Sequence, residues 1–174
     1  IAITPDPVTL AIGGTQQFAA VGKDANGNAV PITPSPTWSV AAGGGRINSA
    51  GLFTAGTVAG TYTNTVKVTS GSISSSVSVT VKAGALATIA ITPDPVTLAI
   101  GGTQQFVAVG KDANGNVIPI APSPTWSVAA GGGTINSAGF FTAGTVPGTY
   151  TKTVKATSGS ISGSMSVTVK AGAL

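Results

Sequence analysis

The sequence predicts an all-β fold made of two tandem β-sandwich domains of about seven strands each. Residues 5–18, PDPVTLAIGGTQQF, return unchanged as residues 93–106, so the 174 residues contain one 88-residue unit written twice. Within a unit, short runs of alternating apolar and polar residues are separated by turn signals, and no helical periodicity is present. These observations assign residues 1–86 to a first β-sandwich domain and residues 87–174 to a second.

The start of the unit predicts a strand, a turn and a second strand. Residues 8–12 alternate between large apolar and smaller residues, as in a strand with one buried face. The glycine pair at 13–14 favours a turn because glycine adopts positive φ without steric cost, and Phe18 is expected to point into the core from the next strand. We expect a hairpin-like entry to the domain, with Pro5 and Pro7 at an edge or a kink before it.

The stretch KDANGN at residues 23–28 predicts a hairpin turn, because Asn-Gly is among the strongest short turn signals. Asp24, Asn26 and Asn28 also have the odd spacing with which acidic loops offer oxygen ligands to calcium. A single carboxylate with no later Glu makes a poor calcium site, so the turn is favoured and calcium stays the alternative.

Trp38 lies in a short predicted strand, TWSV, after a proline-rich segment. The simplest role for its indole is core packing, and the alternative is a platform on which a carbohydrate ring stacks. The glycines at 43–45 are followed by neither Lys-Ser/Thr nor a helical pattern, which excludes a phosphate-binding loop. Residues 46–56, RINSAGLFTAG, predict two short extended pieces around a tight turn.

The end of the unit contains its most regular strands. In residues 60–68 apolar and polar positions alternate, except that Asn64 interrupts the apolar side, at a bulge or an edge. After the Ser70-Gly71 turn, residues 72–81 place β-branched apolar side chains on one face and hydroxyls on the other. This strand therefore belongs to a sheet with one side against a core.

Composition excludes several function classes. The formal charge is +4, from 8 Lys and Arg against 4 Asp, and the basic residues are spaced singly, which argues against nucleic-acid binding. The chain has no Cys, which excludes disulfides and thiolate metal sites. No apolar run reaches the roughly 18 to 20 residues that cross a bilayer, so no membrane insertion is expected within this segment.

Catalysis is not expected, and we predict no enzyme, no catalytic residue, no metal and no cofactor. The only carboxylates are Asp6, Asp24, Asp94 and Asp112, and the chain has neither His nor Glu. Only Asp6 and Asp24 could act as an acid/base pair within a unit, and two predicted strands separate them in sequence. A structural Lys-Asn or Lys-Asp amide crosslink is an alternative that lacks a Glu to assist the reaction.

The order and spacing of GGTQQF, the Trp38 strand, RINSAGLFTAG, GTYTNTVKVT and SVSVTV resemble bacterial immunoglobulin-like domains of group 2, found in tandem in surface adhesins related to intimin and invasin. The resemblance spans nearly all of both copies. One departure is Thr15-Gln16, where many relatives carry a charged residue. The resemblance implies an extracellular, cell-surface spacer, stalk or adhesin module, and it implies no catalytic or ligand residue.

The two copies differ at 11 positions, mostly by exchanges of apolar size such as Ala19/Val107 and Val77/Met165. These exchanges are typical of alternative packings of one core. Since Ile1 and Ile89 hold the same position in the repeat, we expect an excerpt from a longer array whose partners are neighbouring identical repeats. The short junction around Leu86 favours an extended rod, with Leu86 packed at the seam between units.

The sequence is compatible with three functions. The leading one is an extracellular stalk, spacer or fibre of a bacterial surface protein. The second is a domain that itself binds carbohydrate, protein or ice through Thr-rich strand faces. The third is a self-associating filament subunit, because low charge reduces repulsion and an unpaired edge strand can accept another chain.

Overall fold

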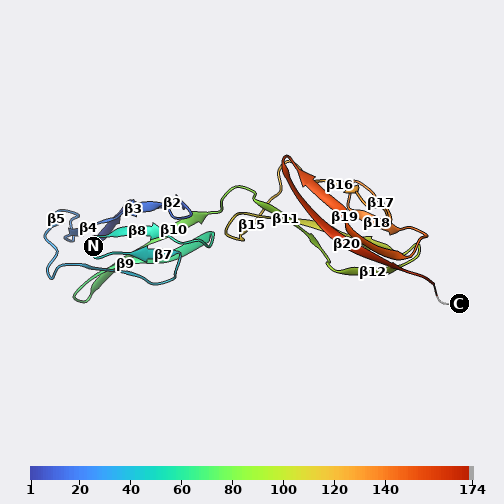
Figure 1. Cartoon of the computed structure of the whole chain (residues 1–174). Helices are drawn as coiled ribbons and strands as arrows, with labels where there is room; N and C mark the ends of the chain where they lie inside the picture. Colours follow the sequence, from blue (N-terminus) through green and yellow to red (C-terminus); the bar gives the residue numbers. More distant parts are fainter. Residues whose placement is uncertain (173–174) are drawn as a thin grey trace. The chain divides into compact units, whose positions relative to one another are not determined.

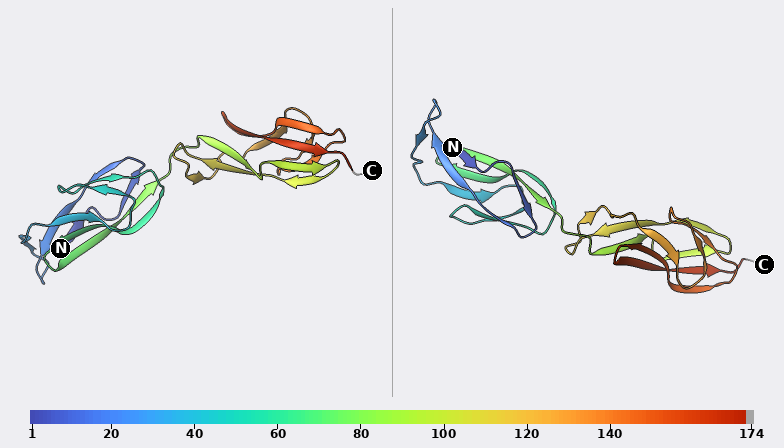
Figure 2. Two further views of the ribbon diagram at one scale, coloured as in Figure 1. Left: turned by 60° about the horizontal axis from the view of Figure 1, so that its bottom comes forward. Right: turned by 90° about the horizontal axis from the view of Figure 1, so that it is seen from above.

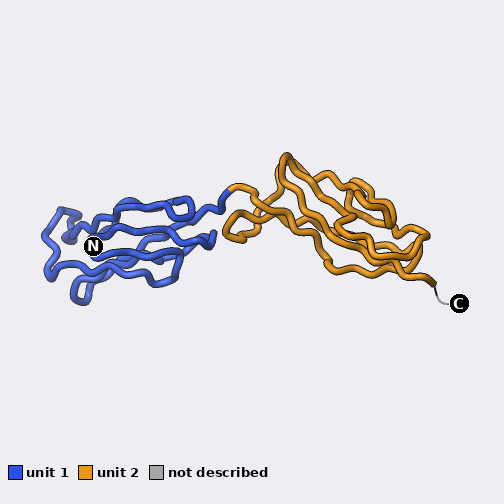
Figure 3. Tube along the Cα trace, in the orientation of Figure 1, with its two compact units in different colours: residues 1–84 blue, residues 85–174 orange. Residues whose placement is uncertain are grey.

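The computed structural model describes residues 1–172 and divides the chain into two compact units, Ile1–Gly84 and Ala85–Leu174 (Figures 1 and 3). The described residues are strands and turns, in agreement with the all-β prediction. Among the described residues, no helix is long and apolar enough to span a bilayer. The strands run lengthwise within each unit (Figure 2).

Within the described residues, each unit has ten strands, of 2 to 11 residues. Those of unit 1 are β1 (Ala2–Thr4), β2 (Val8–Ala11), β3 (Thr15–Gln17), β4 (Ala19–Lys23), β5 (Ala29–Val30), β6 (Thr37–Val40), β7 (Gly45–Ile47), β8 (Leu52–Ala55), β9 (Gly60–Ser70) and β10 (Ile73–Lys82). Those of unit 2 are β11 (Thr88–Thr92), β12 (Val96–Ala99), β13 (Thr103–Gln105), β14 (Val107–Lys111), β15 (Val117–Ile118), β16 (Thr125–Val128), β17 (Gly133–Ile135), β18 (Phe140–Ala143), β19 (Gly148–Ser158) and β20 (Ile161–Lys170).

Each unit is a sandwich. In unit 1, a four-stranded sheet with the order β2-β10-β9-β6 forms one layer, and the sheets β1-β4-β5 and β3-β8-β7 form the other. Unit 2 repeats these orders with β12-β20-β19-β16, β11-β14-β15 and β13-β18-β17. The fully buried residues Val66, Val68 and Val79 of the first layer meet Phe53 and Phe18 of the second. The alternation seen in the sequence thus buries one face of each sheet.

The predicted hairpin-like entry is wrong, because the two strands it would pair lie in different sheets. β2 pairs with β10, and β3 pairs with β8. The strand is interrupted at Phe18, whose backbone N–H donates to the Gly51 carbonyl at 2.9 Å. The next residues form β4, which pairs with β1. The single strand predicted after the glycine pair is therefore two strands, β3 and β4. Interruptions of this kind give each unit ten strands where about seven are expected from the sequence.

In each four-stranded sheet, the strand that comes first along the chain runs parallel to the strand that comes last. β2 pairs with β10 in the register Val8↔Val79 to Ala11↔Lys82, and β12 pairs with β20 in the same way. The prolines at 5 and 7 lie between β1 and β2, so they mark the crossing from one layer to the other. Because the parallel pair joins the start and the end of a unit, the chain enters at one end of the sandwich and leaves at the other.

Asn64 lies at a β-bulge, one of the two positions expected for it. The register between β9 and β10 shifts between Val77 and Val79, and Asn64 adopts a φ of 52°. Its backbone N–H donates to Ser78 Oγ at 3.0 Å. The bulge recurs in unit 2, where Lys152 has a φ of 51° and donates to Ser166 Oγ at 3.0 Å.

Candidate functional site

The outer face of the four-stranded sheet carries a row of threonines. Thr80 lies opposite Thr9 on one side and Thr61 on the other, and the hydroxyls of Thr61 and Thr80 are 3.2 Å apart. Unit 2 has the same row, made of Thr97, Thr168 and Thr149. Neighbouring strands lie about 4.8 Å apart, so each row presents three hydroxyls at regular spacing.

The hydroxyl surface is interrupted farther along the same sheet. Beyond Ser78 and the Asn64 bulge, Lys67 lies between Ser39 and Ser76 in an outward-facing row of the strands β6, β9 and β10. Beyond it, Thr69 lies between Thr37 and Ser74. A cationic side chain thus separates two short hydroxyl rows, and the flat face available to a ligand is limited to a few residues.

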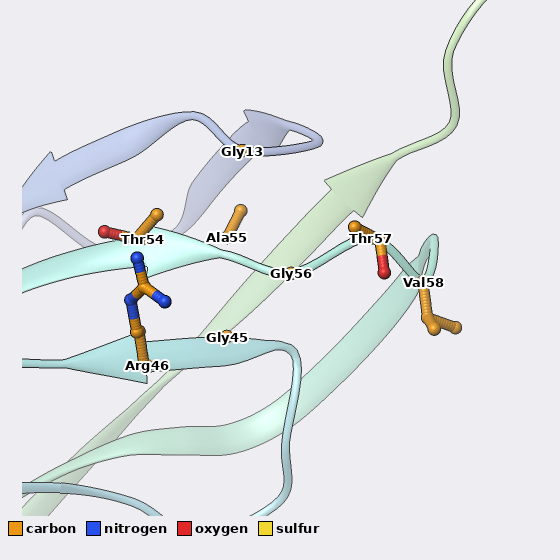
Figure 4. Close-up of a pocket in the computed structure, with 8 residues that line it drawn as sticks. All are labelled: Gly13, Gly45, Arg46, Thr54, Ala55, Gly56, Thr57 and Val58. Atoms are coloured by element: carbon orange, nitrogen blue, oxygen red, sulfur yellow. The ribbon is translucent and has the colours of Figure 1, made fainter. Parts of the chain in front are cut away.

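A pocket of about 610 Å³ lies on the other layer of unit 1. Arg46 of β7 lies opposite Thr54 of β8, and the side chains of both residues belong to the pocket wall (Figure 4). The remaining wall is formed by Gly13, Gly45, Ala55, Gly56, Thr57 and Val58. A guanidinium beside hydroxyls is suited to a carboxylate or another small anion.

The Arg46 pocket was not predicted, although Arg46 is the only arginine of the chain. Unit 2 has Thr134 at the equivalent position, opposite Thr142. Any anion bound at Arg46 would therefore be specific to unit 1, and the pocket cannot define a function shared by the two copies.

The proposed calcium residues Asp24, Asn26 and Asn28 lie together in the turn between β4 and β5. Asp24 Oδ1 accepts hydrogen bonds from the backbone N–H groups of Asn26 at 2.9 Å and Asn28 at 2.8 Å, and Oδ2 accepts from Asn28 Nδ2 at 2.9 Å. Both carboxylate oxygens thus hold the turn closed. The side-chain hydrogen bond from Asn28 is the main cause that lowers the pKa of Asp24 below its ordinary value of 3.8.

The turn itself is confirmed, with one difference in backbone conformation. Gly22 pairs with Val30, and Lys23 pairs with Ala29, on either side of it. Gly27 has a φ of 86°, whereas Asn26 is not among the residues with positive φ. The Asp24 carboxylate therefore closes the loop, and only one residue needs the left-handed conformation.

Trp38 packs against the core of unit 1 and is half-buried. Its ring centroid lies 6.4 Å from that of Phe18 at an interplanar angle of 36°. Trp126 packs in the same way against the core of unit 2. This placement favours the packing role over an exposed stacking platform.

The two carboxylates considered as an acid/base pair lie in different connections. Asp6 lies between β1 and β2, and Asp24 lies in the β4–β5 turn, where its oxygens are engaged as described above. Among residues 1–172, no group of three or more His, Cys, Asp or Glu side chains could hold a metal ion.

No family model matches the sequence. Ice-binding protein 1 of Shewanella frigidimarina is 33% identical over 130 residues, which cover 74% of this chain and 14% of that protein. The chain thus spans about one seventh of the length of this curated relative. Mouse cadherin-23 EC22–24 matches with a TM-score of 0.53 at 13% identity over 97% of this chain and 64% of that one.

Surface layer protein SbsC, domains 1–6, matches 92% of this chain and 24% of that chain at 26% identity, with a TM-score of 0.42. The likeness to cadherin-23 concerns the fold alone, and it agrees with the β-sandwich predicted from the sequence.

Proposed function

We propose that the chain is a non-enzymatic extracellular spacer, a pair of repeats in the stalk or fibre of a bacterial surface protein. The observation that carries the proposal is the parallel pairing of β2 with β10 and of β12 with β20. In each unit this pairing joins the strand that begins the four-stranded layer to the strand that ends the unit.

The parallel pair gives each unit a defined response to tension. A pull between the ends of a unit acts along β2 and β10 in opposite directions, across hydrogen bonds that lie transverse to the pull. The four paired positions, Val8↔Val79 to Ala11↔Lys82, are then loaded together in shear. Separating them requires several hydrogen bonds to break at once, whereas an antiparallel hairpin pulled open loses its bonds one at a time.

The relatives support an assignment to the outside of the cell. The matched segment is a small part of a much longer ice-binding protein, as expected for repeats within a large extracellular protein. The order of motifs supports membership in the bacterial immunoglobulin-like domains of group 2, and the cadherin-like fold supports a tandem adhesion or spacer domain. Neighbouring repeats of the same kind are the proposed partners.

Small-angle X-ray scattering tests the spacer proposal. Strands of 10 to 11 residues at ~3.3 Å per residue give each unit a length on the order of 40 Å. If the units act as spacers, the maximum dimension of the chain should be roughly twice that length. A maximum dimension close to that of a single unit would show that the pair folds back on itself and contradict the proposal.

Direct binding through the threonine rows is the second candidate function. It is favoured by the regular row of Thr9, Thr80 and Thr61 and by the printed name of the relative, which binds ice. Ice affinity and glycan binding of the chain, compared with a Thr61→Lys/Thr149→Lys double variant that interrupts the row in both units, test this candidate. Loss of binding in the variant would support direct binding through the threonine rows. Equal binding by the two chains would contradict it and leave the spacer role as the proposed function.

Self-association through edge strands also remains a proposal. β2 and β6 are the outer strands of the four-stranded sheet in unit 1. Because an edge strand presents unpaired backbone groups, β2 or β6 could accept a strand from another chain. Electron microscopy of concentrated protein would show filaments if this occurs.

A further inference from the structure

Leu86 belongs to the core of unit 2. It packs against the buried cluster together with Ile120 and Ile161, and a Cβ built on Gly110 would lie 2.8 Å from Leu86 Cδ1. The next residue, Ala87, donates its backbone N–H to the Lys111 carbonyl at 2.9 Å. The short segment before β11 therefore supplies one apolar side chain and one backbone hydrogen bond to its own sandwich.

Unit 1 has the same surroundings without the leucine. The equivalents of Ile120 and Ile161 are Ile32 and Ile73, and neither packs against the core of unit 1. Ile73 is 58% exposed, whereas Ile161 is half-buried. Ile1 is half-buried, whereas its counterpart in unit 2 is buried.

A cavity of about 110 Å³ lies at this place in unit 1. Its wall includes Ile1, Gly22, Val30, Ile32 and Ile73. Pockets for drug-sized ligands are roughly 300 to 1,000 Å³, so this cavity is too small for them. Truncating one buried leucine leaves a cavity on the order of 150 Å³, so a single branched aliphatic side chain is of a suitable size.

We propose that this cavity of unit 1 is the receptor for the leucine of an Ala-Gly-Ala-Leu-Ala-Thr segment, the sequence of residues 83–88, supplied by another repeat joined ahead of Ile1. The segment would take the path that residues 86–88 take in unit 2, with its leucine between Ile32 and Ile73. The alanine after the leucine would donate its N–H to the Lys23 carbonyl, as Ala87 does to Lys111. This pairing would extend β1, which has 3 residues, toward the 5 residues of β11.

A second difference between the units offers a rival explanation of the cavity. Gly163 of β20 lies so close to the Ile89 carbonyl that a Cβ there would clash with it. Unit 1 has Ser75 at the equivalent position. If Ser75 alone kept β1 away from β10, the cavity would close on Ser75→Gly without any added segment, so the test must separate the two causes.

The test compares the chain with two extended chains, which carry Ala-Gly-Ala-Leu-Ala-Thr or Ala-Gly-Ala-Ala-Ala-Thr before Ile1. All three carry Trp126→Phe, so that the fluorescence of Trp38 reports the denaturant unfolding of unit 1. We expect the leucine extension to lower the unfolding equilibrium constant of unit 1 about tenfold relative to the alanine extension. Leu86→Ala in a Trp38→Phe chain calibrates the method, because loss of this leucine should raise the unfolding equilibrium constant of unit 2 by a similar factor.

Two further variants locate the effect. Ile73→Ser should change the stability of unit 1 in the unextended chain little, because Ile73 is mostly exposed. It should abolish the gain in stability that the leucine extension gives.

Equal stability of the leucine and alanine extensions would overturn the proposal, as would a gain in stability that survives Ile73→Ser. A Ser75→Gly chain that reaches the same stability without an extension, and gains nothing further from the leucine, would overturn it in favour of the rival explanation. The inference depends on the repeat architecture and is independent of the load-bearing role.

Discussion

At the scale of single residues, the bulge positions Asn64 and Lys152 offer a matched exchange between the two units. Both adopt a left-handed backbone with φ near 50°, and both are exposed. Asparagine tolerates this conformation better than lysine does. Lys152→Asn should therefore stabilise unit 2 by roughly 0.5 to 1 kcal/mol, and Asn64→Lys should destabilise unit 1 by a similar amount.

Denaturant unfolding followed through Trp126 or Trp38 measures these two changes separately, when the other tryptophan is replaced by Phe. The exposed Thr63→Ser serves as a control that leaves the left-handed residue intact. Opposite signs for the two exchanges are expected. If Lys152→Asn destabilised unit 2, the account of the bulge would be wrong.

The Asp24 turn predicts how unit 1 responds to acid. Hydrogen bonds, first from the Asn28 side chain, lower the pKa of Asp24 in the folded chain below 3.8. The unfolded chain therefore binds this proton more readily, so the contribution to stability is present above about pH 4 and is lost as pH falls through the lowered pKa. Between about pH 5 and 9 the absence of His and Glu predicts a nearly flat stability.

Melting temperatures of the Trp126→Phe chain between pH 9 and pH 2 test this prediction. Asp24→Asn should reduce the loss of stability of unit 1 in acid and leave the plateau above pH 5 flat. An unchanged acid slope in Asp24→Asn would show that other groups cause the loss.

At the scale of elements, Gly163 is predicted to set the distance between β11 and β20. A serine there would place its Cβ against the Ile89 carbonyl, with the carbonyl carbon 2.8 Å away. Gly163→Ser should therefore destabilise unit 2 by about 1 to 3 kcal/mol. Unfolding of unit 2 followed through Trp126 measures the change, and Ser75→Ala in unit 1, followed through Trp38, is the tolerated control. A cost below about 0.5 kcal/mol would mean that β11 shifts freely over the sheet.

Several elements could be predicted from the sequence because local patterns decide them. The alternation in β10 and the Asp24 turn depend on neighbouring residues, and both were predicted correctly. The break at Phe18 depends on the Gly51 carbonyl, which is distant in sequence, so alternation alone indicated one strand and a hairpin. Asp24, Asn26 and Asn28 were correctly placed in one loop, but their hydrogen bonds depend on side-chain geometry that spacing does not specify.

The role of Leu86 shows the same limit. Its position between two repeats predicts packing at the seam, and the structure adds that its side chain packs against the core of unit 2, a contact that the repeat period does not specify. The Arg46 pocket likewise arises from the pairing of β7 with β8 and the loop after β8. Such features depend on which strands pair in the fold, and the repeat period does not specify that pairing.

At the scale of the whole molecule, the spacer proposal requires each sandwich to resist tension through its parallel pair, β2–β10 in unit 1 and β12–β20 in unit 2. In unit 2, the Ile100 N–H donates to the Lys170 carbonyl at 3.2 Å at the end of this pairing. Ile100→Pro removes that donor, and Ile100 is 39% exposed, so little packing is lost. The intact β2–β10 pair of unit 1 provides an internal reference in the same molecule.

Mechanical unfolding of single chains held at their two ends tests this claim most directly. We expect two separate rupture events, each releasing roughly 250 Å, because about 84 residues at ~3.4 Å per residue extend to roughly 290 Å and the folded unit already spans about 40 Å. Ile100→Pro should lower the rupture force of one event and leave the other unchanged. A single joint event, or two events whose forces are the same in the variant and the original chain, would contradict the account.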